Sequence, residues 1–217
     1  MKALLLDLDG TIVDSDPVHV AVFIDLLAEF GHDISAEHYF TALHGRQNVA
    51  IFSELLPNED PQAMSERKEA MYRERLDQVA PIAGLPDLLA RARARGVKLG
   101  VVTNAPRANA DAVLAAFGMS DTFDTIVIGE ECARGKPDPL PYATGLANLG
   151  ADPAHSFAVE DSPAGIRSAV AAGLYTFGMR SSLTAEKLLA AGAHDTITDF
   201  NARAIHTRLD RLTGATV

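Results

Sequence analysis

The chain has 217 residues, a length that suits one sizeable domain or one domain with a smaller insert. Hydrophobic residues make up 47% of it and charged residues 22%, which is enough for a substantial core. A formal net charge of −10 argues against nucleic acid as the main partner, because phosphate backbones select basic surfaces. A small anionic substrate is still compatible with this charge, since local positive charge can oppose the global sign.

Nothing in the sequence indicates export or a membrane. The chain has a single cysteine, Cys132, so an intramolecular disulfide is impossible and a reducing compartment is expected. No stretch approaches the length of a membrane span, and the four apolar residues after Lys2 are too few for a signal peptide. We therefore expect a soluble, cytoplasmic monomer with neither a membrane nor a nucleic acid as its partner.

In chain order, apolar runs bounded by turn residues alternate with helical patterns that begin near a proline and end at a glycine. Strands are expected at residues 2–9, 97–103, 124–129, 156–161, 174–179 and 195–198. Helices are expected at residues 85–96, 106–118, 139–150 and 163–173. This alternation predicts an α/β fold, a Rossmann-like doubly wound parallel sheet with helices on both faces.

One region interrupts the alternation. Residues 16–79 contain no good strand and carry helical patterns, the clearest at residues 17–31 and 61–79. We therefore predict an α/β core domain formed by residues 1–15 and 80–217, with a small all-helical domain of residues 16–79 inserted after the first strand.

Polar side chains follow the predicted strands at the points where those strands end. Because parallel strands place their carboxyl ends at one edge of the sheet, these side chains should converge in a single crevice. They are Asp7 and Asp9 after the first strand, Thr103 and Asn104 after the second, Lys136 in the loop after the third, and Glu160 and Asp161 after the fourth.

These residue types suit phosphoryl transfer. Carboxylates form the oxygen-only sites that Mg²⁺ prefers, and a carboxylate can also attack phosphorus as a nucleophile. Asp7 and Asp9, one residue apart on a strand, would face the same side, so that one could attack while the other moved the proton. Lys136 and Thr103 would bind phosphoryl oxygens.

Taken singly, each of these residues has a simpler interpretation. Asp7 and Asp9 could begin a solvated Asp-Gly turn, Thr103 could be a strand-end residue, and Lys136 could be a solvated surface lysine. Glu160 and Asp161 together resemble an ordinary helix start, where the dipole favours acids. Their order favours the catalytic interpretation, because local structural preferences alone would not place such residues at the ends of successive strands.

Four segments, DLDGTIVDS, VVTNA, GKPDP and VEDSPAG, resemble the motifs of the haloacid dehalogenase-like (HAD) phosphohydrolase superfamily in order and spacing. The helical insert resembles the cap domain of the β-phosphoglucomutase and phosphoglycolate phosphatase branch. The resemblance implies Asp7 as the nucleophile, Asp9 as the acid and base, and Thr103 and Lys136 as phosphoryl ligands. It also implies a Mg²⁺ site made by Asp7, Asp161, the backbone carbonyl of Asp9 and, as a further acid, Glu160.

A further set of residues is expected to contact the substrate. Asn104 would join them from the core, and the resemblance adds His19, Lys68 and the segment Gly45 to Asn48, which contains Arg46. His19 could position Asp9 or be a structural residue. Arg46 and Lys68 could equally be solvated helix charges, and for Lys68 we favour that alternative.

The sequence therefore predicts a Mg²⁺-dependent phosphatase that acts through an aspartyl-phosphate on a small phosphorylated metabolite. The expected substrate is a sugar or polyol phosphate, or phosphoglycolate. One alternative is a phosphotransferase of the β-phosphoglucomutase type, which returns the phosphoryl group to a second hydroxyl. Another is a non-catalytic binding module on the same fold.

Overall fold

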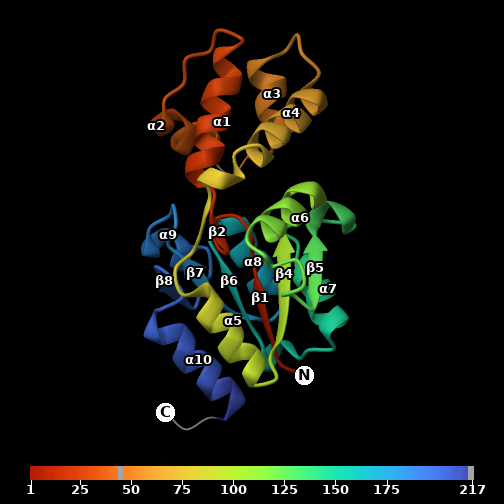
Figure 1. Cartoon of the computed structure of the whole chain (residues 1–217), viewed down its shortest axis with the longest axis vertical. Helices are drawn as coiled ribbons and strands as arrows, with labels where there is room; N and C mark the ends of the chain where they lie inside the picture. The colour runs from red at the N-terminus through yellow and green to blue at the C-terminus, as the bar shows by residue number, and fades with distance from the viewer. Residues whose placement is uncertain (44–45, 215–217) are drawn as a thin grey trace. The chain divides into compact units, whose positions relative to one another are not determined.

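A computed structural model describes residues 1–43 and 46–214, which fall into two compact units (Figure 1). The first, here called the α/β unit, comprises Met1–Asp14 and Ala80–Val217. The second, the helical unit, comprises Ser15–Val79. The division into a core domain of residues 1–15 and 80–217 and an inserted domain of residues 16–79 stays a prediction.

The α/β unit is built on a six-stranded parallel sheet. In pairing order its strands are β5 (Thr125–Ile128), β4 (Lys98–Thr103), β1 (Ala3–Leu6), β6 (Phe157–Glu160), β7 (Tyr175–Met179) and β8 (Asp195–Ile197). The chain runs outward from β1 to β5, returns to the other side of β1 with β6, and continues outward to β8. The order reverses at β1, where doubly wound sheets bind ligands beyond the carboxyl ends of their strands. The predicted fold class is confirmed.

Helices cover both faces of this sheet (Figure 1). They are α5 (Leu85–Ala94), α6 (Arg107–Ala116), α7 (Leu140–Leu149), α8 (Pro163–Ala171), α9 (Ala185–Ala190) and α10 (Arg203–Thr213). In Figure 1, α5 and α10 lie in front of the sheet and α8 lies behind it. Leu5 and Val102 from the strands form a buried cluster with Tyr142 and Leu146 of α7. Burial on both faces explains why β1 is an uninterrupted apolar run.

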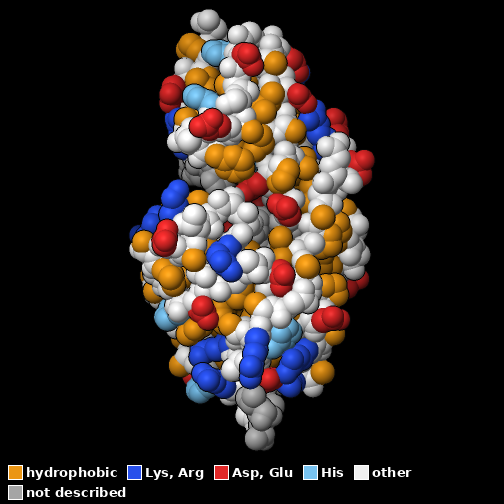
Figure 2. Space-filling model, turned by 90° about the vertical axis from the view of Figure 1, so that its left-hand side faces the viewer, with side chains coloured by type: hydrophobic (Ala, Val, Ile, Leu, Met, Phe, Trp, Pro, Cys, Tyr) orange, Lys and Arg blue, Asp and Glu red, His pale blue; other side chains and the backbone are white. Residues whose placement is uncertain are grey.

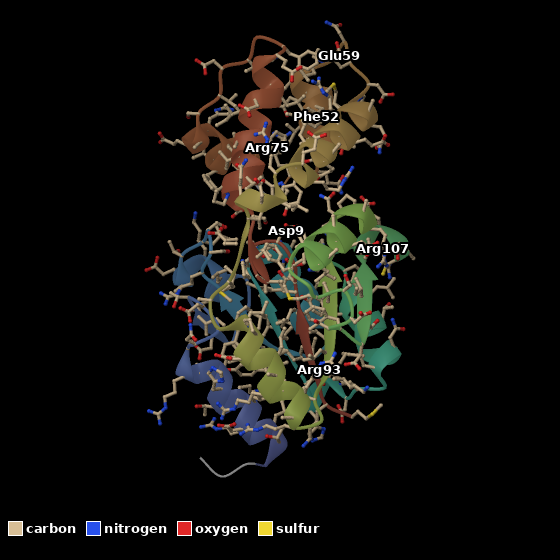
Figure 3. The ribbon with its side chains drawn as sticks, in the orientation of Figure 1. Asp9, Phe52, Glu59, Arg75, Arg93 and Arg107 are labelled. Atoms are coloured by element: carbon tan, nitrogen blue, oxygen red, sulfur yellow. The ribbon has the colours of Figure 1, made fainter. Side chains whose placement is uncertain are left out.

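The helical unit has its own apolar core. Its elements are α1 (Asp16–Ala28), α2 (Ala36–His38), a π-helix (Tyr39–Leu43), α3 (Asn48–Leu55), α4 (Pro61–Arg73) and a 3₁₀ turn (Leu76–Gln78). Phe23 of α1 and Phe52 of α3, the latter labelled in Figure 3, are both buried with their ring centroids 5.6 Å apart. Asp60 caps α4 by accepting hydrogen bonds from the backbone N–H groups of Gln62 and Ala63.

A short antiparallel pair links the chain segments that lead to and from the helical unit. It consists of β2 (Val13–Asp14) and β3 (Ala80–Pro81), neither of which was expected from the sequence. Helices α9 and α10 were also not expected, and α2 and α3 lie in the region expected to be helical without having been assigned individually. Each of the six expected strands of the sheet is present. None of the helices in the described ranges combines the length and the apolar character needed to cross a membrane.

Candidate active site

Three carboxylates meet at the carboxyl edge of the sheet. Asp7 directly follows β1, and its backbone N–H donates to the Val159 carbonyl at 3.1 Å, which continues the pairing with β6. Glu160 ends β6, and Asp161 is the next residue. Asp7, Glu160 and Asp161 are all buried, and each offers an oxygen within 4.8 Å of the others. Buried carboxylates this close repel one another, so cations are needed to stabilise them.

Lys136 provides one such cation. Its Nζ donates to Asp7 Oδ1 and Glu160 Oε1, both at 2.5 Å, and to the Val102 carbonyl at 2.7 Å. Only 4% of its side chain is exposed. The alternative reading of Lys136 as a solvated surface lysine is therefore wrong.

The protonation of this ion pair follows from burial and charge. Burial raises the pKa of Asp7 to about 7; Lys136 opposes this rise, while the charges of Glu160 and Asp9 add to it. Burial alone would lower the pKa of Lys136, but Asp7 and Glu160 outweigh it and hold that pKa above its ordinary value. Lys136 is thus a permanent cation beside Asp7, and an ammonium group in this position suits a phosphoryl oxygen.

Glu160 is held in place from several sides. It is fully buried; its Oε1 accepts from Lys136 and from the Tyr142 hydroxyl at 2.8 Å, and its Oε2 accepts from the Ser162 hydroxyl at 3.2 Å. Gly165 of α8 packs against the same carboxylate so closely that a Cβ atom there would overlap it. Glu160 therefore orients Lys136 while contributing to the acidic cluster.

Asn104, in the segment VVTNA, holds Lys136, in the segment GKPDP. Its Oδ1 accepts from the Lys136 backbone N–H at 3.2 Å, and its Nδ2 donates to the Lys136 carbonyl at 3.3 Å. These contacts fix the backbone of Lys136, so the structure gives Asn104 a positioning contact in addition to the substrate contact expected from the sequence. Thr103 ends β4 with only 2% of its surface exposed, and its Oγ1 accepts from the Ala105 N–H at 3.0 Å.

Asp9 reaches this edge through a tight turn (Figure 3). The Leu8 carbonyl accepts from the backbone N–H groups of Ile12 and Val13 at 2.8 and 3.2 Å. Gly10 has a φ of +70°, and a Cβ there would lie 2.5 Å from Asp161 Oδ2, so glycine alone lets the turn lie against Asp161. The expectation that the first strand extends to Asp9 is wrong: β1 ends at Leu6, and the turn brings Asp9 to the site.

The donor set of the acidic cluster fits Mg²⁺. Asp7, Glu160 and Asp161 offer carboxylate oxygens, the hard donors that this ion prefers, from positions close enough to share one ion. A divalent cation would also offset the negative charge that Lys136 alone leaves in excess.

In the helical unit, Lys68 and His19 belong to one polar cluster. Lys68 is only 4% exposed, and its Nζ lies 2.8 Å from His19 Nδ1 and 3.0 Å from Glu69 Oε1. The His19 ring stacks on Tyr72 with centroids 4.1 Å apart, and Asn48 donates to Glu69 Oε1 at 2.6 Å. The alternative of a solvated helix charge is wrong for Lys68, which is a buried cation with fixed partners.

Arg46 is placed differently. Its side chain is 37% exposed, and it forms an ion pair with Glu54 at 2.6 Å within the same unit. Gly45, which was assigned to the same substrate-contacting segment, lies outside the described residues. The structure therefore leaves the proposed substrate roles of Arg46 and Gly45 as predictions.

Sequence reasoning missed Tyr142 and Gly165, the residues that hold Glu160. Tyr142 is fully buried; burial raises the pKa of its hydroxyl well above the ordinary value, and the charges of Glu160 and Asp7 raise it further. It therefore stays a hydrogen-bond donor. A signal was present, since Tyr142 lies one turn into the helix that follows GKPDP, and Gly165 ends the VEDSPAG motif.

Comparisons with known proteins agree with this geometry. The model of the haloacid dehalogenase-like hydrolase family matches residues 4–179. Protein CbbY of Rhodobacter capsulatus is 37% identical over 188 residues, which cover 80% of this chain and 83% of that protein. A phosphoglycolate phosphatase of Cupriavidus necator is 35% identical over 79% of this chain and 78% of its own length. The β-phosphoglucomutase of Bacillus subtilis is 29% identical over 82% and 83%.

The solved structure of a HAD hydrolase of family IA, variant 3, from Entamoeba histolytica superposes with a TM-score of 0.88. It is 25% identical in sequence, and the match covers 99% of this chain and 100% of that one. The similarity thus includes both units as well as the motifs at the sheet edge. The chain therefore belongs to the haloacid dehalogenase-like hydrolases, in their β-phosphoglucomutase and phosphoglycolate phosphatase branch, and is a phosphoric monoester hydrolase.

Proposed function

We propose that this protein is a Mg²⁺-dependent phosphatase that hydrolyses a small phosphorylated metabolite through an aspartyl-phosphate on Asp7. The observation that carries the proposal is the buried contact of Lys136 Nζ with both Asp7 and Glu160, beside Asp161. A structural ion pair needs one carboxylate for one lysine. Here three buried carboxylates, Asp7, Glu160 and Asp161, share one lysine, so the site needs a further cation to balance their charge.

The proposed reaction has two steps, each using residues of the sheet edge. A carboxylate oxygen of Asp7 attacks phosphorus, the ester P–O bond breaks, and Asp9 donates a proton to the departing oxygen. Asp9 then takes a proton from water, the water oxygen attacks phosphorus, and the bond to Asp7 breaks to release phosphate. Lys136 and Thr103 hold the phosphoryl oxygens during both steps.

We assign Asp7 and Asp161 as the side chains that would hold Mg²⁺, with Glu160 beside them and the backbone carbonyl of Asp9 as a further ligand. When bound, the ion supplies positive charge to the carboxylates and to the phosphoryl group. Without it, the acidic cluster would repel a phosphate dianion.

The proposed substrates are sugar or polyol phosphates, or phosphoglycolate. Support comes from the relatives, which include a phosphoglycolate phosphatase and a β-phosphoglucomutase. We further propose that His19, Arg46 and Lys68 of the helical unit contribute to the choice among them. Asn104 is proposed to act mainly through Lys136.

The test is a phosphate-release screen over sugar, polyol, glycolate and nucleotide phosphates, with Mg²⁺ and with excess chelator. We expect at least one metabolite to be hydrolysed only with the metal, and Asp7→Asn to remove that activity. Full activity in chelator would contradict the metal-dependent mechanism.

The same screen separates the alternatives. A phosphotransferase would convert glucose 1-phosphate into glucose 6-phosphate faster than it releases phosphate, which the similarity to β-phosphoglucomutase makes worth measuring. A binding module would turn over none of the panel, nor a generic aryl phosphate. The intact set of Asp7, Asp9, Lys136 and Asp161 argues against that outcome.

A further inference from the structure

A hollow of about 340 Å³ opens beside α10, on residues that the proposed reaction does not use. Arg203, Arg208 and Arg211 of α10 line it together with Tyr175 and other residues of the strand ends beneath. Arg208 and Arg211, three residues apart, are neighbours on the helix surface, and Arg203 lines the same hollow from the first residue of the helix. Figure 2 shows Lys and Arg side chains gathered at the lower end of the view, where α10 lies.

These arginines lack the counter-charges that others nearby possess. Asp210, on the same helix, pairs with Arg91 at 2.7 Å and also with Arg95, both of α5. Within residues 1–43 and 46–214, by contrast, no carboxylate forms an ion pair with the three arginines of the hollow. One carboxylate, that of Asp195, lines the hollow, and it accepts a hydrogen bond from the Thr196 N–H at 2.7 Å. The hollow therefore keeps an excess of positive charge in a chain whose net charge is −10.

Arg208 is the least satisfied of the three. Its Nε is buried and has no hydrogen-bond acceptor among the described residues. Its guanidinium carbon lies 4.2 Å from the centroid of the Tyr175 ring, and the residue also lines an adjoining hollow of about 300 Å³. Burial lowers the pKa of Arg208, and the neighbouring charge of Arg211 lowers it further. An anion in the hollow would offset the neighbouring positive charges of Arg208 and Arg211.

The surroundings restrict the kind of anion. His194 stacks on the Tyr175 ring with centroids 4.6 Å apart, while Arg208 also covers that ring. Each face of a single ring takes one such group, so both faces of Tyr175 are occupied and a nucleobase cannot stack there. Guanidinium groups match the oxygens of a phosphate in charge and geometry. Phe177 and Tyr175 add apolar surface for a small carbon skeleton.

The hollow is separate from the catalytic residues of the same unit. Tyr175 and Asp195 are the first residues of β7 and β8, whereas Thr103 and Glu160 are the last residues of β4 and β6. By strand register, Tyr175 is level with Phe157, which puts it about 10 Å from Glu160 along the strand direction at about 3.3 Å per residue. Asp195 is level with Val159 but lies two strands away from β6, about 10 Å across the sheet at about 4.8 Å per strand. In Figure 3, Asp9 is labelled at one end of this unit and Arg93 of α5 towards the other.

We propose that the hollow lined by Arg203, Arg208 and Arg211 is a second anion-binding site, which takes a small phosphate-bearing ligand and is separate from the catalytic site. This inference does not depend on the proposed reaction.

The experiment is calorimetric titration of the full chain with inorganic phosphate, pyrophosphate and glucose 6-phosphate, in excess chelator and at matched ionic strength. Without a metal, the acidic catalytic cluster repels these anions, so the α10 hollow is the site that remains. Arg203 and Arg211 are exposed, so replacing both with Gln should not disturb the fold. Arg67→Gln is the control, because it removes an equally exposed charge from the helical unit.

We expect one metal-independent site whose affinity falls on the order of ten- to a hundredfold in Arg203→Gln/Arg211→Gln, as for lost charged hydrogen bonds. Arg67→Gln and Asp161→Asn should bind as the wild type does. In amide NMR spectra, the shifts should be centred on Tyr175 and Thr207. Tightest binding of glucose 6-phosphate would identify a phosphomonoester ligand, and tightest binding of pyrophosphate a diphosphate.

Three results would overturn the proposal. The first is the absence of binding by all three anions at millimolar concentration. The second is equal affinity in the wild type and the double arginine variant. The third is tighter binding in Asp161→Asn, which would place the anion at the catalytic cluster, where this substitution removes a repelling charge.

Discussion

At Gly165, a single hydrogen atom separates the backbone of α8 from the carboxylate of Glu160. A methyl group there would displace that carboxylate, and with it Lys136, from its contact with Asp7. We predict that Gly165→Ala lowers kcat by on the order of 10²-fold, comparable to the loss of one electrostatic donor, while the protein still folds. Steady-state kinetics with an aryl phosphate, beside circular dichroism, would measure both effects.

The matched control for this prediction is Gly145→Ala in the interior of α7. There a Cβ would lie 3.2 Å from a side-chain carbon of Val102 and would not touch Glu160. Gly145→Ala should therefore leave kcat within a few-fold of the wild type. If both variants lose the same activity, the packing of Gly165 against the Glu160 carboxylate does not affect catalysis.

The proposed acid role of Asp9 predicts a dependence on the leaving group. Asp9→Asn should slow phosphoryl transfer from an alkyl phosphate by about 10²–10⁴-fold, since that leaving group needs a proton. An aryl phosphate leaves as a more stable anion and should lose much less in the same step. Single-turnover transfer rates for the two substrates decide the matter, and equal losses would count against Asp9 as the acid.

Most of the site could be predicted from individual residues, and the exceptions have a common cause. Asp7, Lys136 and Asp161 were identified because each occupies a strand end or the loop after one, and that position follows from chain order. The contact of Asn104 with the Lys136 backbone and the burial of Lys68 could not be predicted. Both depend on how segments distant in the chain pack, which no local pattern encodes.

At the scale of elements, α10 is attached to α5 through Asp210. Hydrogen bonds from Arg95 and from Arg91 hold the pKa of Asp210 below its ordinary value. A depressed folded-state pKa stabilises the protein above the unfolded pKa, and that contribution is lost as the pH falls through the folded value. Asp210→Asn should therefore lower the free energy of unfolding at pH 7.

This difference should persist down to a pH of about 4 and then shrink, because protonated Asp210 no longer pairs as an anion. Urea unfolding over a series of pH values, with exposed Asp121→Asn as the control, gives the measurement. A difference that stays constant into the acid range would mean that the pairing charge of Asp210 does not stabilise α10.

Elements were predictable where their pattern is local. The strands of the sheet are apolar runs closed by turn residues, and the helices between them carry proline and glycine at their ends. Helix α10 has no N-terminal proline, but it carries Ile205, Leu209 and Leu212 at helical spacing and ends at Gly214, so its signal was present in the sequence and was missed. Strands β2 and β3 are too short to show the alternation of apolar and polar residues that identifies a strand. They form only because residues 13–14 and 80–81 pair across a long separation in the chain.

At the scale of the whole molecule, chemistry and substrate choice are proposed to belong to different units. Arg46→Ala should lower kcat/KM for the preferred metabolite by roughly 1.5–3 kcal/mol if a charged hydrogen bond is lost. An aryl phosphate without a remote polar group should be affected far less. Because Arg46 is exposed in an ion pair with Glu54, its removal should leave the helical unit folded.

The control for Arg46 is Arg67→Ala, which breaks a similarly exposed pair with Glu29 in the same unit. Arg67→Ala should leave kcat/KM unchanged for both the preferred metabolite and the aryl phosphate. Equal losses for both substrates in Arg46→Ala would show that this residue supports the fold of the helical unit and does not select the substrate.

The most direct test of the proposed mechanism is to trap the phosphoenzyme. An aryl phosphate labelled with ³²P is mixed with enzyme and Mg²⁺ and quenched in acid within one turnover. We predict label that hydroxylamine releases and that maps to the peptide containing Asp7, no label in Asp7→Asn or in chelator, and more label in Asp9→Asn, where hydrolysis of the intermediate is slowed. Label that persists in Asp7→Asn, or phosphate release without any covalent label, would contradict the mechanism.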